Sequence, residues 1–171
     1  MKKNNWTYKV FIITFLLASI FSLLTNLFTN VNILILATII LIVIFIGIIF
    51  DMIGVATLTS EEKNFHARAS KKIKGAKESI SLLKNANIVT SLTNDVIGDI
   101  CGIISGGLGA TLSLILSQKF NINIILATTI IAAIISSLTV GGKAIGKNIA
   151  IKNSDSIIFM VGKLKSVLKI K

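Results

Sequence analysis

The chain has 171 residues, 53% of them hydrophobic, and a mean hydropathy of +0.87, which is too apolar for an ordinary soluble domain. The single cysteine, Cys101, excludes a disulfide-stabilised secreted domain. One histidine and seven acidic residues leave few groups for metal-cluster or triad chemistry, so we expect no enzymatic activity.

The basic residues lie in three clusters that predict membrane topology. The clusters are Lys2, Lys3 and Lys9, then Lys63, Arg68, Lys71, Lys72, Lys74, Lys77 and Lys84, and finally Lys143, Lys147, Lys152, Lys163, Lys165, Lys169 and Lys171. With four membrane spans, all three clusters fall on one side and only Lys119 falls on the other, a 17-to-1 asymmetry. We therefore expect a cell (inner or plasma) membrane protein with both termini cytoplasmic and membrane lipids as partners. No nucleic acid is expected as a partner, because the basic segments carry no binding motif.

The first 50 residues predict two spans. No charged residue occurs from Val10 to Phe50, which is enough for two apolar helices of about 20 residues each. The first is expected from Val10 to about Leu24, and an external turn over Thr25–Asn32. The second runs from about Ile33 to Phe50 and is followed directly by Asp51.

The polar segment 59–87 predicts juxtamembrane helices that lie in the membrane interface. Thr59 and Glu62 fit a capping box at the start. Apolar residues then recur every three or four positions, at Phe65, Ala69, Ile73, Ala76, Ile80 and Leu83. Such a stripe is suited to the membrane surface. Gly75 weakens the middle by about 1 kcal/mol and is expected to divide the segment into two helices.

The third span, from about Ile88 to Ser117, combines carboxylates with glycines. Asn94, Asp95 and Asp99 lie in its first third, and Gly98, Gly102 and Gly106 follow at intervals of four. At 3.6 residues per turn the two aspartates share a face with the last two glycines. Small residues let helices approach closely, so we expect this face to pack against another helix, within the chain or across a dimer.

The fourth span and the tail complete the predicted elements. The span is expected from about Ile122 to Val140. A helix-start signal at residues 153–155 precedes Ile157, Val161, Leu164 and Leu168, which recur at helical spacing among lysines. The basic tail, residues 151–171, is therefore expected to form a second interfacial helix.

Three carboxylates are the candidate metal ligands. Asp51 is expected near the same leaflet as Asp95 and Asp99, and oxygen ligands suit a hard cation such as Mg²⁺. Intramembrane carboxylates are functional candidates because a charge at mid-bilayer costs at least about 2.5 kcal/mol. In the alternative, the third span begins near Gly98 and Asp95 is a solvated helix-start residue. The sequence leaves both open.

Residues from Phe45 to about Val167 resemble the membrane domain of the cyclin M / CorB / CorC (CNNM) family. The matching segments are Phe50–Ala56, Gly75-Ala76, Leu82–Asn85, Asn94–Asp99 and Gly142–Lys147. The resemblance implies magnesium or other divalent-cation (Mg²⁺, Co²⁺) transport and a homodimer. Aspartates stand at both Asn positions of the family's Gly-Asn-x-x-x-Asn motif, and Lys143 stands where the family has Glu. Lys143 is therefore either an internal counter-ion to the aspartates or directed away from a bound cation.

The sequence thus predicts an all-α membrane protein with about four transmembrane helices plus juxtamembrane and C-terminal amphipathic helices. We expect one membrane domain over residues 1–171. Its parts are an additional span and turn (1–32), a CorC-like core (33–150) and the basic tail, and we expect no cytoplasmic CBS pair. The expected function is divalent-cation transport-related, with no resident cofactor. The alternative is a non-transporting scaffold or regulatory subunit.

Overall fold

The computed structural model describes residues 3–25 and 31–168, with the side chains of residues 3–7, 9 and 10 also excluded. Every described element is a helix, which confirms the all-α prediction. Much of the predicted external turn, at 26–30, lies outside the described residues, as do Lys2, Lys169 and Lys171 and the side chains of Lys3 and Lys9. The chain divides into unit 1, Met1–Ile48 with Val96–Gly142, and unit 2, Ile49–Asp95 with Lys143–Lys171.

Within residues 3–25 and 31–168, three helices are long and apolar enough to cross a membrane. They are α2 (Ile33–Thr59), the continuous helical segment Ala86–Phe120, and α7 (Ile124–Lys152). The first predicted span corresponds to α1 (Lys3–Thr25), whose described apolar part is shorter, Phe11–Thr25. The chain is therefore a multi-pass membrane protein with three long apolar helices and one shorter apolar helix.

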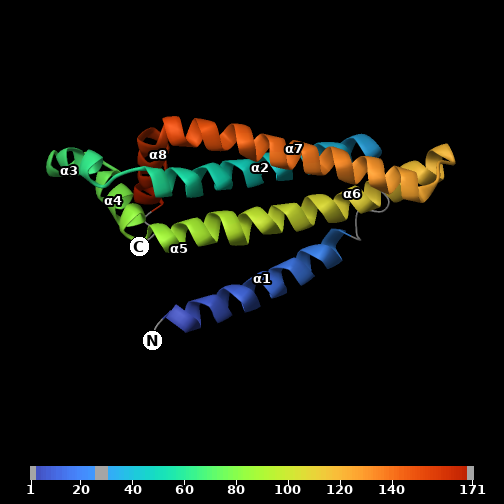
Figure 1. The fold of residues 1–171 in the computed structure, drawn as a ribbon, viewed down its shortest axis with the longest axis horizontal. Helices are drawn as coiled ribbons and strands as arrows, with labels where there is room; N and C mark the ends of the chain where they lie inside the picture. Colours follow the sequence, from blue (N-terminus) through green and yellow to red (C-terminus); the bar gives the residue numbers. More distant parts are fainter. Residues whose placement is uncertain (1–2, 26–30, 169–171) are drawn as a thin grey trace. The chain divides into compact units, whose positions relative to one another are not determined.

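Unit 1 is held together by aliphatic side chains from helices that run side by side (Figure 1). Leu36, Ile40 and Ile44 of α2 meet Leu108 and Leu112 of α6 (Asp99–Phe120) and Ile135 of α7 in one buried cluster. The helix α1 also packs against α6. Apart from the N-terminal lysines, the sequence of unit 1 contains only Asp99 and Lys119 as charged residues. Unit 1 therefore corresponds to the apolar spans.

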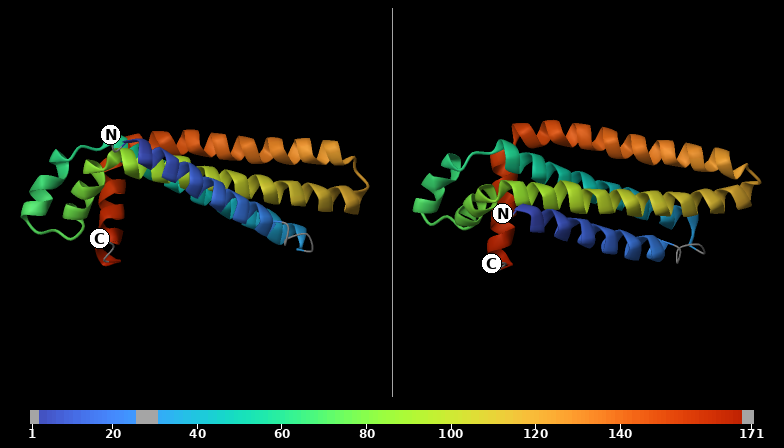
Figure 2. Two further views of the ribbon diagram at one scale, coloured as in Figure 1. Left: turned by 90° about the horizontal axis from the view of Figure 1, so that it is seen from below. Right: turned by 60° about the horizontal axis from the view of Figure 1, so that its bottom comes forward.

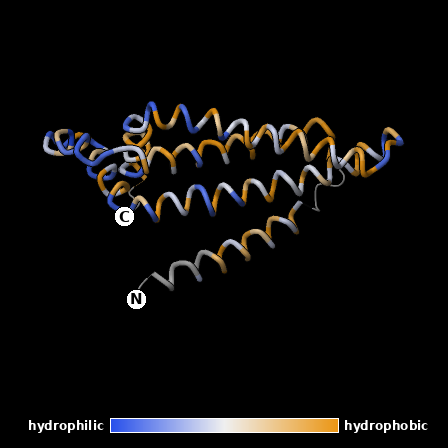
Figure 3. Tube along the Cα trace, viewed as in Figure 1, coloured by the Kyte–Doolittle hydropathy of each residue, from blue (hydrophilic) through white to orange (hydrophobic). Residues whose placement is uncertain are grey.

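Unit 1 also exposes large apolar side chains, and hydrophobic residues recur along its trace (Figure 3). Phe15, Phe45, Ile125 and Val140 are each more than 60% exposed. Large apolar side chains in such numbers are unfavourable in water but are at no disadvantage in lipid.

Unit 2 contains the short helices and most of the charge. They are α3 (Lys63–Ser70), α4 (Ala76–Lys84), α5 (Ala86–Thr90) and α8 (Ser154–Val167). The π-helix η2 (Ser91–Gly98) continues from α5, and its first five residues belong to unit 2. Its core is the buried set Ala56, Phe65, Leu83, Ala150 and Ile158. The guanidinium of Arg68 lies 4.9 Å from the ring centre of Phe159 and covers one edge of this core.

The predicted division of the juxtamembrane segment is confirmed, whereas the prediction that its whole apolar stripe faces the membrane is wrong for three of the six residues, and Ile73 remains exposed. Gly75 adopts φ +94°, a conformation that favours glycine, between α3 and α4. Phe65, Ala76 and Leu83, however, are buried inside unit 2 rather than presented to the membrane. The periodicity located the apolar face correctly. That face, however, packs against α8 and the end of α2, not against lipid as predicted.

The predicted capping box is also wrong. Thr59 is the last residue of α2, and its hydroxyl donates to the carbonyl of Val55 at 3.0 Å. Glu62 precedes α3 without a side-chain cap. In the same turn, Glu61 forms an exposed ion pair with Lys63 and raises the pKa of Lys63 through its hydrogen bond and then through its charge. Such an exposed pair contributes little to stability.

Candidate functional site

An ion pair links the end of the second apolar run to α7. The ammonium of Lys143 lies 3.6 Å from Asp51 Oδ1, and the two side chains are only 29% and 17% exposed. Each charge offsets the cost of removing the other from water, so loss of either partner would leave an uncompensated charge. The structure pairs Lys143 with Asp51, and pairing of Lys143 with Asp95 or Asp99 stays a prediction.

The chain approaches itself closely at Gly54, one turn beyond Asp51. A Cβ atom on Gly54 would overlap Asn94 Oδ1 and would lie 2.7 Å from Thr93 Oγ1. The hydroxyl of Thr90 also donates to the Gly54 carbonyl, at 3.3 Å. Glycine is thus required for α2 to contact η2, and a polar cluster forms where they meet.

The π-helix η2 positions the second half of this cluster. Four of its first five residues are Ser, Thr, Asn or Asp, side chains that compete for backbone hydrogen bonds and disturb α-helical geometry. Thr93 illustrates this effect, because its hydroxyl lies 3.0 Å from the Val89 carbonyl and 3.3 Å from Asn94 Oδ1. Single-turn π segments often occur at functional sites.

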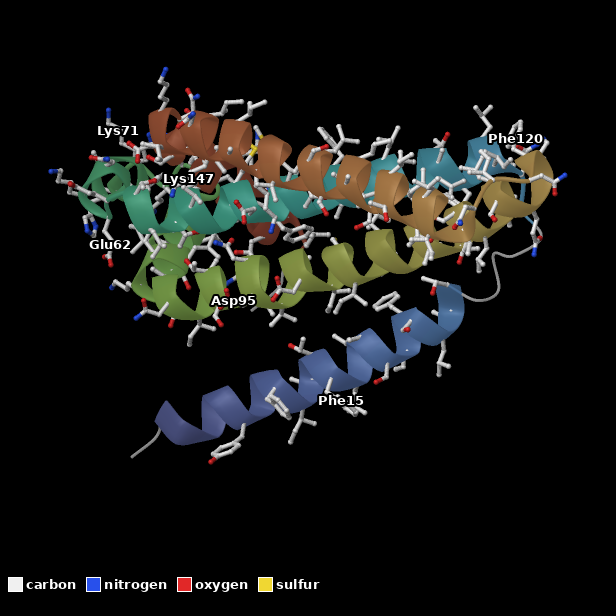
Figure 4. All side chains as sticks on the ribbon, turned by 45° about the vertical axis from the view of Figure 1, so that its right-hand side comes forward. Phe15, Glu62, Lys71, Asp95, Phe120 and Lys147 are labelled. Atoms are coloured by element: carbon white, nitrogen blue, oxygen red, sulfur yellow. The ribbon has the colours of Figure 1, made fainter. Side chains whose placement is uncertain are left out.

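The structure separates the three predicted carboxylate ligands between the units. Asp51 and Asp95 belong to unit 2, with Asp95 on η2 (Figure 4), and Asp99 begins α6 in unit 1. Asp95 and Asp99 are both exposed in this chain. Among the described residues, no three His, Cys, Asp or Glu side chains group to hold a metal ion. Convergence of the three aspartates on one cation stays a prediction.

The glycine stripe is not uniform. Gly98 is buried, whereas a Cβ atom on Gly102 or Gly106 would meet nothing within 4 Å. The last two glycines border a groove of about 280 Å³ between α6 and α7, whose walls are mainly small or hydroxyl-bearing residues. Gly102 and Gly106 therefore do not pack closely against another helix within the described residues. Their packing across a dimer stays a prediction.

Comparison with protein-family models, with curated proteins and with solved structures finds no match for this chain.

Sequence reasoning missed Thr90 and Thr93 as members of the cluster. The sequence pattern places both in a regular apolar span, although the density of hydroxyl and amide side chains around them is a usable signal. Gly54 was recognised only through the family resemblance, because a single glycine in an apolar helix has no specific pattern.

Proposed function

We propose that this chain is a divalent-cation-transport-related membrane protein of the cyclin M / CorB / CorC type. The observation that carries the proposal is the meeting of three segments that are far apart in sequence. Gly54 contacts Asn94, and Asp51 pairs with Lys143, so residues from each of the three main resembling motifs contribute to unit 2. Such convergence is expected of a functional site and is not required for a chain that only anchors other proteins.

In this proposal Lys143 occupies the resting position of a cation. Its ammonium neutralises Asp51, and Mg²⁺ competes with it for Asp51, with Asn94 and Asp95 as further oxygen ligands of unit 2. Oxygen ligands of this kind suit Mg²⁺, which retains several waters and needs few protein carboxylates. Orientation follows the basic asymmetry, with both termini cytoplasmic.

The second candidate is a non-transporting scaffold or regulatory subunit, and the same ion pair favours it. A carboxylate already paired with lysine needs no metal to be stable. In that case, Lys143 has permanently replaced the cation.

Replacement of Lys143 distinguishes these candidates. The change Lys143→Glu places two carboxylates together and should lower the unfolding temperature in detergent without Mg²⁺, because like charges repel and the counter-ion is lost. Full loss of a partner in a buried pair costs about 3–5 kcal/mol, and this partly exposed pair should cost less. If a cation site exists, saturating Mg²⁺ should restore stability, by about 2.7 kcal/mol at one hundred times Kd.

The matched control is Lys147→Glu, one turn further along α7 and exposed (Figure 4). It has the same charge change and should show no Mg²⁺-dependent recovery. Mg²⁺ flux into proteoliposomes, measured with an entrapped indicator, then separates binding from transport. If Mg²⁺ stabilises neither wild type nor Lys143→Glu and the Asp95→Asn/Asp99→Asn double variant is unperturbed, the cation function is refuted and the scaffold remains.

A further inference from the structure

The helix α8 has one face covered by protein and another that is apolar and uncovered. On the covered face, Ile158 is fully buried, and a Cβ atom on Gly162 would lie 2.6 Å from the Gly75 carbonyl oxygen. The Ser79 hydroxyl also lies 3.2 Å from the Ile158 carbonyl. This close crossing fixes the rotation of α8 against α4, so the direction of its other face is determined within unit 2.

The uncovered face carries an apolar stripe. Its members are Met160, Leu164, Val167 and Leu168, each more than half exposed. At 100° per residue Met160, Leu164 and Val167 occupy the side of α8 opposite to Ile158 and Gly162, and Leu168, the C-cap residue, adjoins them. Sequence reasoning had included Ile157 in the lipid-facing stripe, but Ile157 packs against the buried core of unit 2. The structure therefore redefines which residues are available to an external apolar phase.

Charge and chain position indicate what covers the stripe. Lys163, which is exposed, and Lys165, which is half-buried beside the covered face, lie on either side of it around the helix, an arrangement typical of helices at anionic membrane surfaces. A single residue, Asn153, separates α8 from the long apolar helix α7. Ile145 and Ile149 are exposed near the end of α7, so an apolar surface continues toward the turn where α8 changes direction (Figure 2).

We propose that the stripe of Met160, Leu164, Val167 and Leu168 inserts into the surface of an anionic bilayer, with Lys163 and Lys165 binding the lipid phosphates. The inserted helix carries α4 with it through the Gly75–Gly162 crossing. The lipid surface thereby holds unit 2 at a fixed depth. This role is independent of whether the protein binds or transports a cation.

Tryptophan fluorescence tests the proposal in the full-length protein. In a Trp6→Phe background, which removes the only native tryptophan, Leu164→Trp reports the stripe. The matched control is Ser81→Trp, an exposed position on α4, which covers the other face of α8. Each protein is reconstituted in vesicles of phosphatidylcholine alone or mixed with phosphatidylglycerol, with bromine on the upper acyl chains as the quencher.

Insertion predicts that bromolipid quenches Leu164→Trp several-fold more than Ser81→Trp, and more strongly in the vesicles that contain phosphatidylglycerol. Each lysine near an anionic surface contributes about fivefold to binding, so Lys163→Gln/Lys165→Gln should remove the dependence on phosphatidylglycerol. Equal quenching at both positions would overturn the proposal. So would quenching that ignores lipid charge, or a blue-shifted but unquenched Leu164→Trp, which would indicate a protein partner on the stripe.

Discussion

The two units of this chain are stabilised by different kinds of contact. In unit 1 the described hydroxyl hydrogen bonds are local. Ser105 donates to the Gly102 carbonyl and Ser113 to the Gly109 carbonyl, for example. In unit 2 side chains bond across long stretches of sequence, as when Ser60 and Asn64 both donate to Asp155. Packing shape organises the first unit, whereas the second adds specific polar contacts to an apolar core.

The difference follows from the solvent that each unit is expected to meet. Lipid tails are as apolar as leucine, so helices in unit 1 gain little from burying apolar surface and depend on close contact. In unit 2, burial of Phe65 is favourable because it removes apolar surface from water. Polar side chains of unit 2 add stability by forming hydrogen bonds in defined geometry. Unit 1 therefore depends mainly on close packing, whereas unit 2 combines close glycine contacts, at Gly54 and Gly162, with carboxylate hydrogen bonds that select specific partners.

The largest effect should come from removing the centre of the unit 2 core. Phe65 is fully buried, and Phe65→Ala should destabilise unit 2 by about 3–5 kcal/mol through lost burial and a residual cavity. It also removes one ring beneath Arg68. Hydrogen exchange of the α4 amides in detergent or nanodiscs measures the change without requiring the whole chain to unfold.

The comparison variant is Leu108→Ala, at an equally buried position of unit 1. Its cost should fall below the about 2–5 kcal/mol typical of a water-soluble core, because lipid solvates the leucine when the helices separate. Equal protection losses in α4 and α6 would show that unit 1 is stabilised like an ordinary soluble core.

The sequence predicted most of the helices because apolar runs and Gly75 are strong local signals. The sequence did not predict the features that depend on tertiary contacts. The apolar side of α3 and α4 was clear from periodicity, but nothing local distinguishes a stripe that meets lipid from one that meets Ile158. Thr59 likewise matched a capping motif but remained inside α2, because the apolar run continues past Asp51.

The candidate site was predictable only in part. Asp51 and Lys143 are 92 positions apart, and charge alone could not pair them among so many lysines. The resemblance singled out Lys143, whereas the π-helical geometry that presents Asn94 to Gly54 had no precedent in the motif. Exposure of Gly102 and Gly106 was also unpredictable, because the same spacing serves contacts within a chain and between chains.

Two adjacent glycines of α6 test the role of close packing in unit 1. A Cβ atom on Gly107 would lie 3.0 Å from Thr25 Oγ1 of α1, whereas one on Gly106 would meet nothing within 4 Å. Gly107→Leu should therefore destabilise the α1–α6 contact by about 1–3 kcal/mol. Gly106→Leu should leave that contact intact and weaken only the predicted dimer.

Thermal unfolding and chemical cross-linking, applied to both variants, separate stability from oligomeric state. Loss of dimer with retained unfolding temperature for Gly106→Leu is the expected result. If Gly106→Leu changes neither the unfolding temperature nor the cross-linked dimer, the predicted dimer does not use this face of α6, and lipid covers Gly106.

The smallest loss of stability should come from removing side-chain hydrogen bonds. The loss should differ between the units, because the described side-chain hydrogen bonds of unit 1 are local, whereas some of those in unit 2 join distant segments. Asp155 accepts from Ser60 Oγ at 2.5 Å and from Asn64 Nδ2 at 2.8 Å, and these bonds fix the start of α8 against the α2–α3 connection. Asp155→Ala should cost about 1 kcal/mol and increase hydrogen exchange at α3 and α8 together.

Ser113→Ala in unit 1 removes a hydroxyl that bonds to its own helix, at the Gly109 carbonyl, so stability should change little. If Ser113→Ala matches Asp155→Ala, hydroxyl hydrogen bonds contribute to the assembly of unit 1 beyond the helix that contains them.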